Sequence, residues 1–387
     1  MSHGIATDDL TQLPSRRDEG WRWSDLRGLI RQPLPGSEAF GEAVRPGGPF
    51  ESLGLAEVVL ANGHLNWWPE GEVSDGVDVT VHDTPTAPHM SATMPMARLA
   101  ASEASDPKAL IVTFKGAGAP GALVRLVSHA TDSAHHTRVG VMVEPGVSAL
   151  LCESYEGRGS GYLANTLVEI FVGRDARLER LVIADDDATG VSVSSTEVHL
   201  APGAAFSQTV VTTGAKRQRI ETRVNHPGGG ASLRLDGLYL IDGRRHGDIT
   251  TVVVHQGPDG TTEQLTKGVA ADQGRGVFQG RIEVAPGADR TDAKMGHHAL
   301  VLSDHAEVDA KPELEIYADD VVCSHGNTIG ALDEEALFYA RQRGIPEAEA
   351  RAMLTEAFVG EVVDRIEHEG ARDIVRTFVS ARTAGLA

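Results

Sequence analysis

The sequence has few cysteines and few aromatic residues. Among its 387 residues are only two cysteines, Cys152 and Cys323, and aromatic residues make up 5% of the chain. Two cysteines cannot form the disulfide framework of a small secreted domain, so we expect both thiols to be reduced and the protein to be cytoplasmic. The first 20 residues lack the apolar core of a signal peptide. No stretch approaches the roughly 20 apolar residues of a membrane-spanning helix.

Positive charge is also scarce. Lys and Arg number 35 against 55 Asp and Glu, which gives a formal net charge of −20. A chain this acidic repels phosphate backbones and anionic lipid headgroups. Nucleic acids and membranes are therefore excluded as expected partners, whereas a basic protein surface would be attracted.

Glycine, by contrast, is abundant, with 43 residues. From about residue 110 a loose unit recurs, in which a Gly-containing turn is followed by apolar residues at alternate positions, as in "EPGVSALLCES" and "APGAAFSQTVV". Repeated turns and short alternating strands without helices between them fit a β-solenoid or a large sandwich or barrel. We therefore predict a mainly β protein with a mixed, partly helical N-terminal region (1–100), a β-rich core (101–330) and a C-terminal helical domain (331–387).

The C-terminal region has the spacing of helices. Asp333 is placed to cap a helix that ends near Gly344, and Pro346 then starts a second helix. A third follows in "ARDIVRTFVSAR". The second helix carries an apolar stripe at i, i+3 and i+4 spacing that short helices cannot bury completely. We predict that part of this stripe packs on the β core and that part binds a partner, with Met353, Leu354, Phe358 and Val362 as the contact residues.

Cys323 and His325 form a Cys-x-His pair in "YADDVVCSHG". If this stretch is one strand, alternation places Leu314 and Ile316 on the inward face and both Cys323 and His325 on the outward face. The two side chains could then share one metal ion. From the residues alone, three interpretations stay open: a ligand pair, a nucleophile with its base, or the end of a strand with an inert Cys and a surface His.

Other polar clusters allow different chemistry. Asp185, Asp186 and Asp187 could bind Ca²⁺ on a solenoid wall, as in an enzyme that acts on polysaccharides, although three consecutive acids more commonly form a solvated loop. The adjacent pairs His135-His136 and His297-His298 are expected to be surface residues. Since no phosphate-binding loop is present, no nucleotide site is predicted.

The stretch from His255 to Ile345 resembles the SufB/SufD family of iron–sulfur cluster assembly scaffold proteins. The resemblance depends on "KPELEIYADDVVCSHGNTIGALDEEALFYARQRGI", and the opening motif "PSRRDEGWRWSDLRGL" and the "CSHG" form are similar to the SufD branch rather than the SufB branch. The run "AKMGHHALVLS" departs from the family pattern, which is usually rich in Gln and Asn there.

This resemblance implies a right-handed parallel β-helix flanked by helical domains. It implies a non-catalytic scaffold that pairs with a SufB-like subunit through the β-helix and holds a SufC-like ATPase on its C-terminal helices. It also implies that a nascent iron–sulfur cluster forms transiently at the subunit interface, with His325 and, second, Cys323 as candidate ligands. No tightly bound cofactor is expected in the isolated chain, which could also pair with a second copy of itself.

Overall fold

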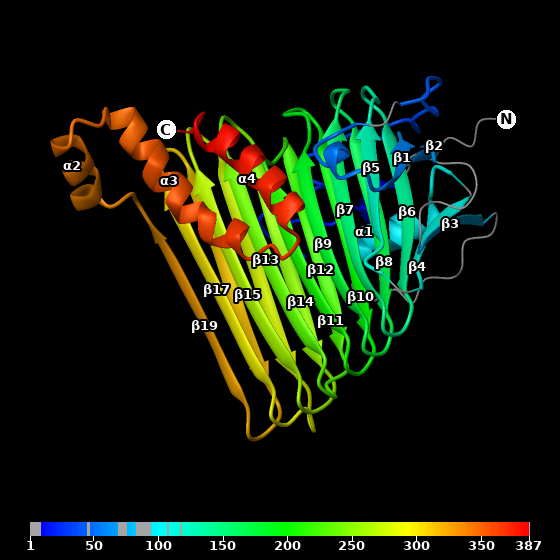
Figure 1. Cartoon of the computed structure of the whole chain (residues 1–387). Helices are drawn as coiled ribbons and strands as arrows, with labels where there is room; N and C mark the ends of the chain where they lie inside the picture. Colours follow the sequence, from blue (N-terminus) through cyan, green and yellow to red (C-terminus); the bar gives the residue numbers. More distant parts are fainter. Residues whose placement is uncertain are drawn as a thin grey trace.

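The chain winds into a parallel β-solenoid of about 8 turns, which confirms the predicted fold class. The computed structural model describes residues 9–44, 47–68, 76–82, 94–106, 108–116 and 118–386. Each turn contributes one strand to each of two facing sheets, and Figure 1 shows the strands stacked from the N-terminal end to the last strand. Among the described residues, the solenoid strands from residue 109 to residue 330 are not interrupted by any α-helix.

The first sheet contains, in chain order, β1 (Ala56–Ala61), β2 (His64–Trp67), β5 (Gly121–Ser128), β7 (Ser148–Gly157), β9 (Arg177–Asp185), β11 (Ala205–Thr212), β13 (Ser232–Ile241), β15 (Thr261–Ala270), β17 (Asp292–Val301) and β19 (Val322–Gly330). The second contains β3 (Val77–His82), β4 (Ala109–Phe114), β6 (Ala134–Val143), β8 (Leu163–Val172), β10 (Val191–Leu200), β12 (Arg217–His226), β14 (His246–His255), β16 (Arg275–Val284) and β18 (Glu307–Ile316).

In-register pairing builds the core. Val182 on β9 pairs with Val210 on β11, and Val253 on β14 pairs with Ile282 on β16, so the same inward position is apolar on successive turns. Because side chains alternate between the two faces of a strand, a sequence with apolar residues at every second position fills the space between the sheets. Each turn then covers the apolar surface of the previous one, as in other solenoids.

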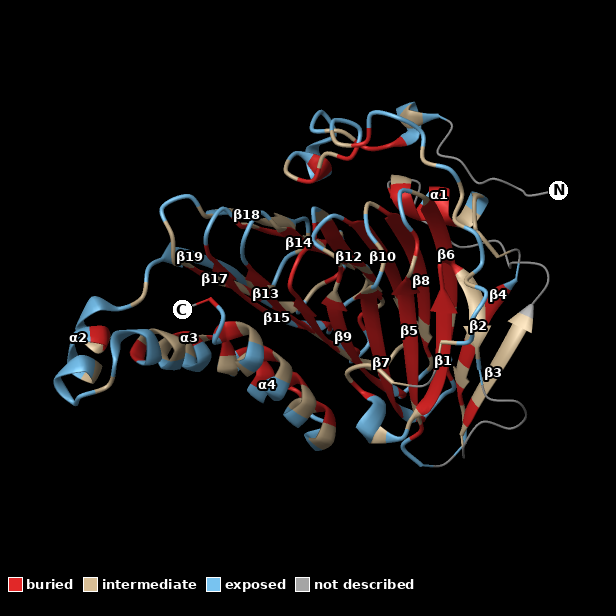
Figure 2. Ribbon diagram, turned by 90° about the horizontal axis from the view of Figure 1, so that it is seen from above, coloured by how far each residue is buried: buried red, intermediate tan, exposed pale blue. Residues whose placement is uncertain are grey.

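The N-terminal segment lies across the outer face of the second sheet (Figure 2). It contains the 3₁₀ turns η1 (Leu10–Gln12) and η2 (Glu19–Trp21), and the helix α1 (Pro95–Ser102) packs on the same sheet, whereas the turn η3 (Glu51–Leu53) packs on the outer face of the first sheet. Trp21, Leu26 and Ile30 pack in one buried cluster with Leu163 of β8 and Val193 of β10. Within the predicted N-terminal region, β1 extends the first sheet and β3 extends the second. The boundaries of the three predicted domains stay a prediction.

Three C-terminal helices follow the solenoid, as predicted: α2 (Glu334–Gln342), α3 (Glu347–Asp364) and α4 (Glu369–Thr383). The Asp333 side chain accepts hydrogen bonds from the backbone N–H groups of Glu335 and Ala336, and Gly344 has the left-handed φ of 85° that ends a helix. The helices α3 and α4 lie over the outer face of the first sheet, opposite the N-terminal segment (Figure 2). Among the described helices, none has the length and apolar character to span a membrane.

Candidate functional site

The solenoid ends with an open face at its C-terminal end. Within the described residues, β19 is the last strand of the first sheet and β18 the last strand of the second, so each leaves one edge without a strand partner. The apolar residues Ile316, Val322 and Ile329 are 43%, 63% and 45% exposed there, and Tyr317 in the connecting turn is 60% exposed. An edge strand with unpaired N–H and C=O groups and exposed apolar side chains is suited to pairing with another chain.

Cys323 and His325 lie on β19 at this open end. Their strand partners on β17 are Ala293 and Met295, which are buried in the core, so both residues belong to the inward row and not to the outward face that was predicted. The prediction was wrong because it treated the segment as one strand. The chain instead changes sheet at the turn around Asp320, which has a φ of 55°, and the alternation starts again on β19.

The two side chains are accessible even though they face inward, because no further solenoid turn in the described part of the chain covers them. Cys323 is half-buried and packs against the core, whereas His325 is exposed. Burial raises the pKa of the Cys323 thiol above its ordinary value, so the thiol is protonated at neutral pH in the chain as it stands. Alternate residues of a strand have Cα atoms about 6.6 Å apart, a separation from which a Cys and a His can reach one ligand.

Cys323 and His325 do not belong to a complete metal site within the part of the chain that the structure describes. Among the described residues, no group of three or more His, Cys, Asp or Glu side chains gathers where it could hold a metal ion. Iron and zinc sites built from Cys and His need about four protein donors, and Cys323 and His325 supply two. A cluster at the open end would therefore require further donors from another chain.

Behind the open face lies a row of hydrogen-bonded side chains that was not predicted from the sequence. Asn327, the next inward residue after His325, has its Oδ1 atom 2.7 Å from Nδ1 of His297, and Nε2 of His297 is 3.0 Å from the Tyr239 hydroxyl. His297 is fully buried and stacks on Phe278, and burial lowers its pKa to about 4. The expectation that His297 lies on the surface was therefore wrong.

The pair His135-His136 is also buried, contrary to prediction, with side chains that bond Ser128 and Asn165. Adjacent residues of a strand point to opposite faces, and here both faces are covered, by the core on one side and by the N-terminal region on the other. A covered outer face has no signal in the alternation itself, which explains the error for His136, whereas His135 and His297 lie in the inward rows of their strands.

The aspartates considered for an ion site have separate partners. Asp185 accepts from Thr213 and Arg382, and buried Asp186 accepts from Tyr162 and Gln218. Asp187 accepts from the backbone and the hydroxyl of Thr189. Asp185 and Asp186 thus tie neighbouring turns and the last helix together, Asp187 stabilises its own loop, and the geometry does not favour the polysaccharide-active alternative.

The predicted partner-binding stripe on α3 is divided by the fold. Val362 is fully buried against the first sheet, while Leu354 and Phe358 are half-buried and Met353 is 51% exposed. The Phe358 ring also receives the ammonium of Lys267 at 4.4 Å from its centroid. Val362 therefore contributes to docking of the helix on the solenoid and is not available to a partner in this structure.

Two exposed aromatic residues on α2 were not predicted as contacts. Phe338 and Tyr339 are 63% and 60% exposed, and α2 projects beyond β19, away from the sheets (Figure 1). Met353 on α3 is exposed as well, and we call these three exposed apolar residues the α2–α3 surface. The helical spacing of Phe338 was visible in the sequence, but its exposure depends on where α2 lies.

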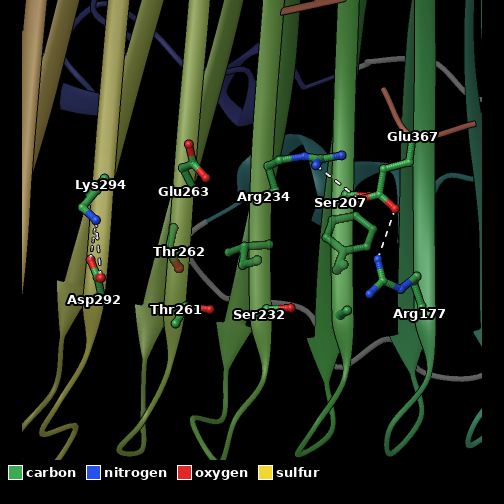
Figure 3. Close-up of a pocket in the computed structure, with 13 residues that line it drawn as sticks. Arg177, Ser207, Ser232, Arg234, Thr261, Thr262, Glu263, Asp292, Lys294 and Glu367 are labelled. Carbon is green, nitrogen blue, oxygen red and sulfur yellow. Dashed lines mark hydrogen bonds and ion pairs between the residues drawn. The ribbon is translucent and has the colours of Figure 1, made fainter. Parts of the chain in front are cut away.

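A cavity of about 390 Å³ lies on the outer face of the first sheet, beside the turn between α3 and α4 (Figure 3). Its charged lining is paired within the chain: Glu367 bonds Arg177 at 3.1 Å and Arg234 at 3.2 Å, and Lys294 bonds Asp292. The two ion pairs of Glu367 fix the helical turn to the sheet. The cavity is therefore explained by the attachment of the helices.

Comparison with known proteins finds a matching family model and several relatives of this chain. Residues 126–358 match the model of the SufBD core domain of SUF system FeS cluster assembly. The chain is 28% identical to iron–sulfur cluster assembly protein SufD of Escherichia coli, over 97% of this chain and 90% of that protein. It is 28% identical to a SufBD family protein of Mycobacterium tuberculosis, over 92% and 86%, and 32% identical to SufD of Bacillus subtilis, over 34% and 30%.

Proposed function

The chain belongs to the SufBD family of SUF system iron–sulfur cluster assembly proteins, and we propose that it is a non-catalytic scaffold subunit of the assembly complex. In this proposal it pairs with a SufB-like subunit through the open end of the solenoid and carries a SufC-like ATPase on its C-terminal helices. The observation that carries the proposal is the open end itself, where two unpaired strand edges and an incomplete Cys-His pair occur together.

Pairing is supported by the chemistry of the open end. A partner strand can continue either sheet by backbone hydrogen bonds, and the exposed Ile316, Val322 and Ile329 supply apolar contact. The same association would bring donors from the partner next to Cys323 and His325, which this chain alone leaves short of a full ligand set. The cluster is the cargo of such a site and is held there transiently.

Docking of an ATPase is supported by the α2–α3 surface. Phe338, Tyr339 and Met353 remain exposed after α3 has buried its other face against the solenoid. Several acidic residues of α3 are paired within the chain, since Glu347, Glu361 and Asp364 each take part in an ion pair. Apolar contact should therefore contribute more than charge to this docking.

The pairing claim is tested with Ile329→Glu, which places a charge on the open face. We expect affinity for a SufB-like subunit, measured by isothermal titration calorimetry, to fall at least about thirtyfold, the loss typical of a central interface residue. Met142→Glu is the matched control, because Met142 is 48% exposed on β6, far from the open end. Equal affinity for both variants would refute pairing through this face.

Docking is tested separately with Phe338→Ala and Met353→Ala. Each variant should weaken capture of the SufC-like ATPase while leaving circular dichroism and SufB-like pairing unchanged. Val362→Ala should instead lower thermal stability, because its side chain is buried on the sheet. Undiminished ATPase capture by the double variant Phe338→Ala/Met353→Ala would place the docking site elsewhere.

A further inference from the structure

The open end contains a third polar side chain in the inward row of β19. Asn327 follows Cys323 and His325 at the same spacing, and its β17 partner is His297. Cys323 and His325 pair with Ala293 and Met295, whose side chains cannot form hydrogen bonds. Asn327, by contrast, is hydrogen-bonded to the buried imidazole of His297. The inward row, in which Ile329 comes next, therefore contains a side chain whose orientation is set by the core.

The hydrogen bonds that link Tyr239, His297 and Asn327 fix the Asn327 amide in one orientation. Because Oδ1 of Asn327 can only accept, Nδ1 of His297 carries the hydrogen and donates to it, and Nε2 of the neutral imidazole then accepts from the Tyr239 hydroxyl. The amide oxygen is thereby occupied. Within the described part of the chain, the Nδ2 group of Asn327 has no partner, and its two hydrogens are available at the exposed end of the solenoid.

The fold makes room for this arrangement. A Cβ atom at Gly268 would lie 1.8 Å from the ring of Tyr239, and one at Gly276 would lie 2.3 Å from it. Gly268 on β15, beside Tyr239, and Gly276 on β16 of the facing sheet thus admit the tyrosine ring to the core. Phe278 stacks on His297 at 4.6 Å with an interplanar angle of 2°. Tyr239 and His297 are accordingly held in place by close packing, which keeps the amide in its orientation.

We propose that Asn327 is a positioning residue for the cargo at the open end, donating a side-chain N–H to a sulfur atom of the iron–sulfur cluster. The inference rests on the proposed scaffold function. Sulfide and thiolate sulfurs bear negative charge, and hydrogen bonds to them stabilise a cluster and tune its reduction potential. Tyr239 and His297 act through Asn327 by keeping its amide nitrogen, and not its oxygen, toward the cargo.

The test uses the complete complex with SufB-like and SufC-like subunits, reconstituted anaerobically with ferrous iron and sulfide. Asn327→Asp keeps an oxygen for His297 but replaces the donor by a second oxygen. Asn327→Leu removes both. Loss of cluster to a chelator should be about tenfold faster in both variants, and the reduction potential should shift, because partners of this kind typically change metal affinity by about 10- to 100-fold. Asn327→Asp should be at least as impaired as Asn327→Leu.

Thr328→Val is the matched control. Thr328 is the next residue of β19 on the opposite face, and its hydroxyl is 2.7 Å from Nδ1 of His298. This variant should keep parental cluster loss and potential. The inference is overturned if Asn327→Asp behaves as the parent, because Asn327 would then serve only as a hydrogen-bond acceptor for His297. It is also overturned if Thr328→Val is equally impaired. If His325→Ala also has no effect on the cluster, the proposed function itself fails.

Discussion

The buried histidines should make the solenoid unstable in mild acid, and His255 gives the sharpest test. It is fully buried, its Nε2 atom is 2.9 Å from the Thr262 hydroxyl, and its ring stacks on His226 at 4.3 Å. Burial lowers the pKa of His255 from 6.5 to about 3, so the folded chain keeps this ring neutral while the unfolded chain protonates it. Its stabilising contribution is therefore present above pH 6.5 and is lost as the pH falls from 6.5 toward 3.

The magnitude follows from linkage. Between these two pKa values the unfolded state binds one more proton than the folded state, so the free energy of unfolding falls by about 1.4 kcal/mol per pH unit. At pH 5 the loss from His255 alone is about 2 kcal/mol. His135, His136, His226 and His297 are shifted in the same direction, to about 3, 4, 4 and 4. Because all five shifts have the same sign, each adds to the loss of stability as the pH falls below 6.5.

The assay is denaturant unfolding followed by circular dichroism at pH values from 7.5 to 5. His255→Gln should reduce the slope of unfolding free energy against pH by about 1.4 kcal/mol per unit, whatever its effect at pH 7.5. His305→Gln, at an exposed turn, is the control and should retain the parental slope. If His255→Gln also keeps the parental slope, or if stability does not decline below pH 6.5, the reasoning is refuted.

Three further predictions concern packing and capping. Arg180 and Glu153 form a bidentate ion pair inside the solenoid. Arg180→Met alone should lower the free energy of unfolding by about 3–5 kcal/mol, because it leaves Glu153 buried without its partner, whereas the double variant with Glu153→Leu should lower it much less. Thermal melts of both variants test this. Val362→Ala should cost about 1–2 kcal/mol because a fully buried side chain is shortened, and Met353→Ala should be within about 0.5 kcal/mol of the parent, as measured by chemical denaturation. Asp333→Ala should destabilise α2 by about 1 kcal/mol, and hydrogen exchange of the Glu335 and Ala336 amides should accelerate.

The solenoid could be predicted because its signal is repeated and local. A turn with Gly or Asp followed by alternating apolar residues recurs on each strand, and the in-register pairs, such as Val182 with Val210, show that the alternation does select the inward face. Helix boundaries at Asp333 and Gly344 were also predictable, since capping depends on residues within one turn.

The errors arose where the decisive contact was not local. The outward placement of Cys323 and His325 failed because the turn around Asp320 moves the chain to the other sheet, and alternation cannot be carried through such a turn. His297 and Val362 were misjudged because other parts of the chain cover them: the core beside Phe278 for His297, and the first sheet for Val362. Neither cover is visible in the neighbouring sequence.

The central claim is that the open end of the solenoid shares a nascent cluster with a partner subunit. The most direct measurement is the iron and acid-labile sulfide retained by the reconstituted complex when this chain carries His325→Ala, compared with His305→Ala, a histidine at an exposed turn. With His325→Ala, the complex should retain at least tenfold less iron and sulfide, because removing second-sphere groups already lowers metal affinity by about 10- to 100-fold and a ligand should matter no less. With His305→Ala, the complex should retain as much as the parent. Equal retention by both variants, with pairing intact, would contradict it.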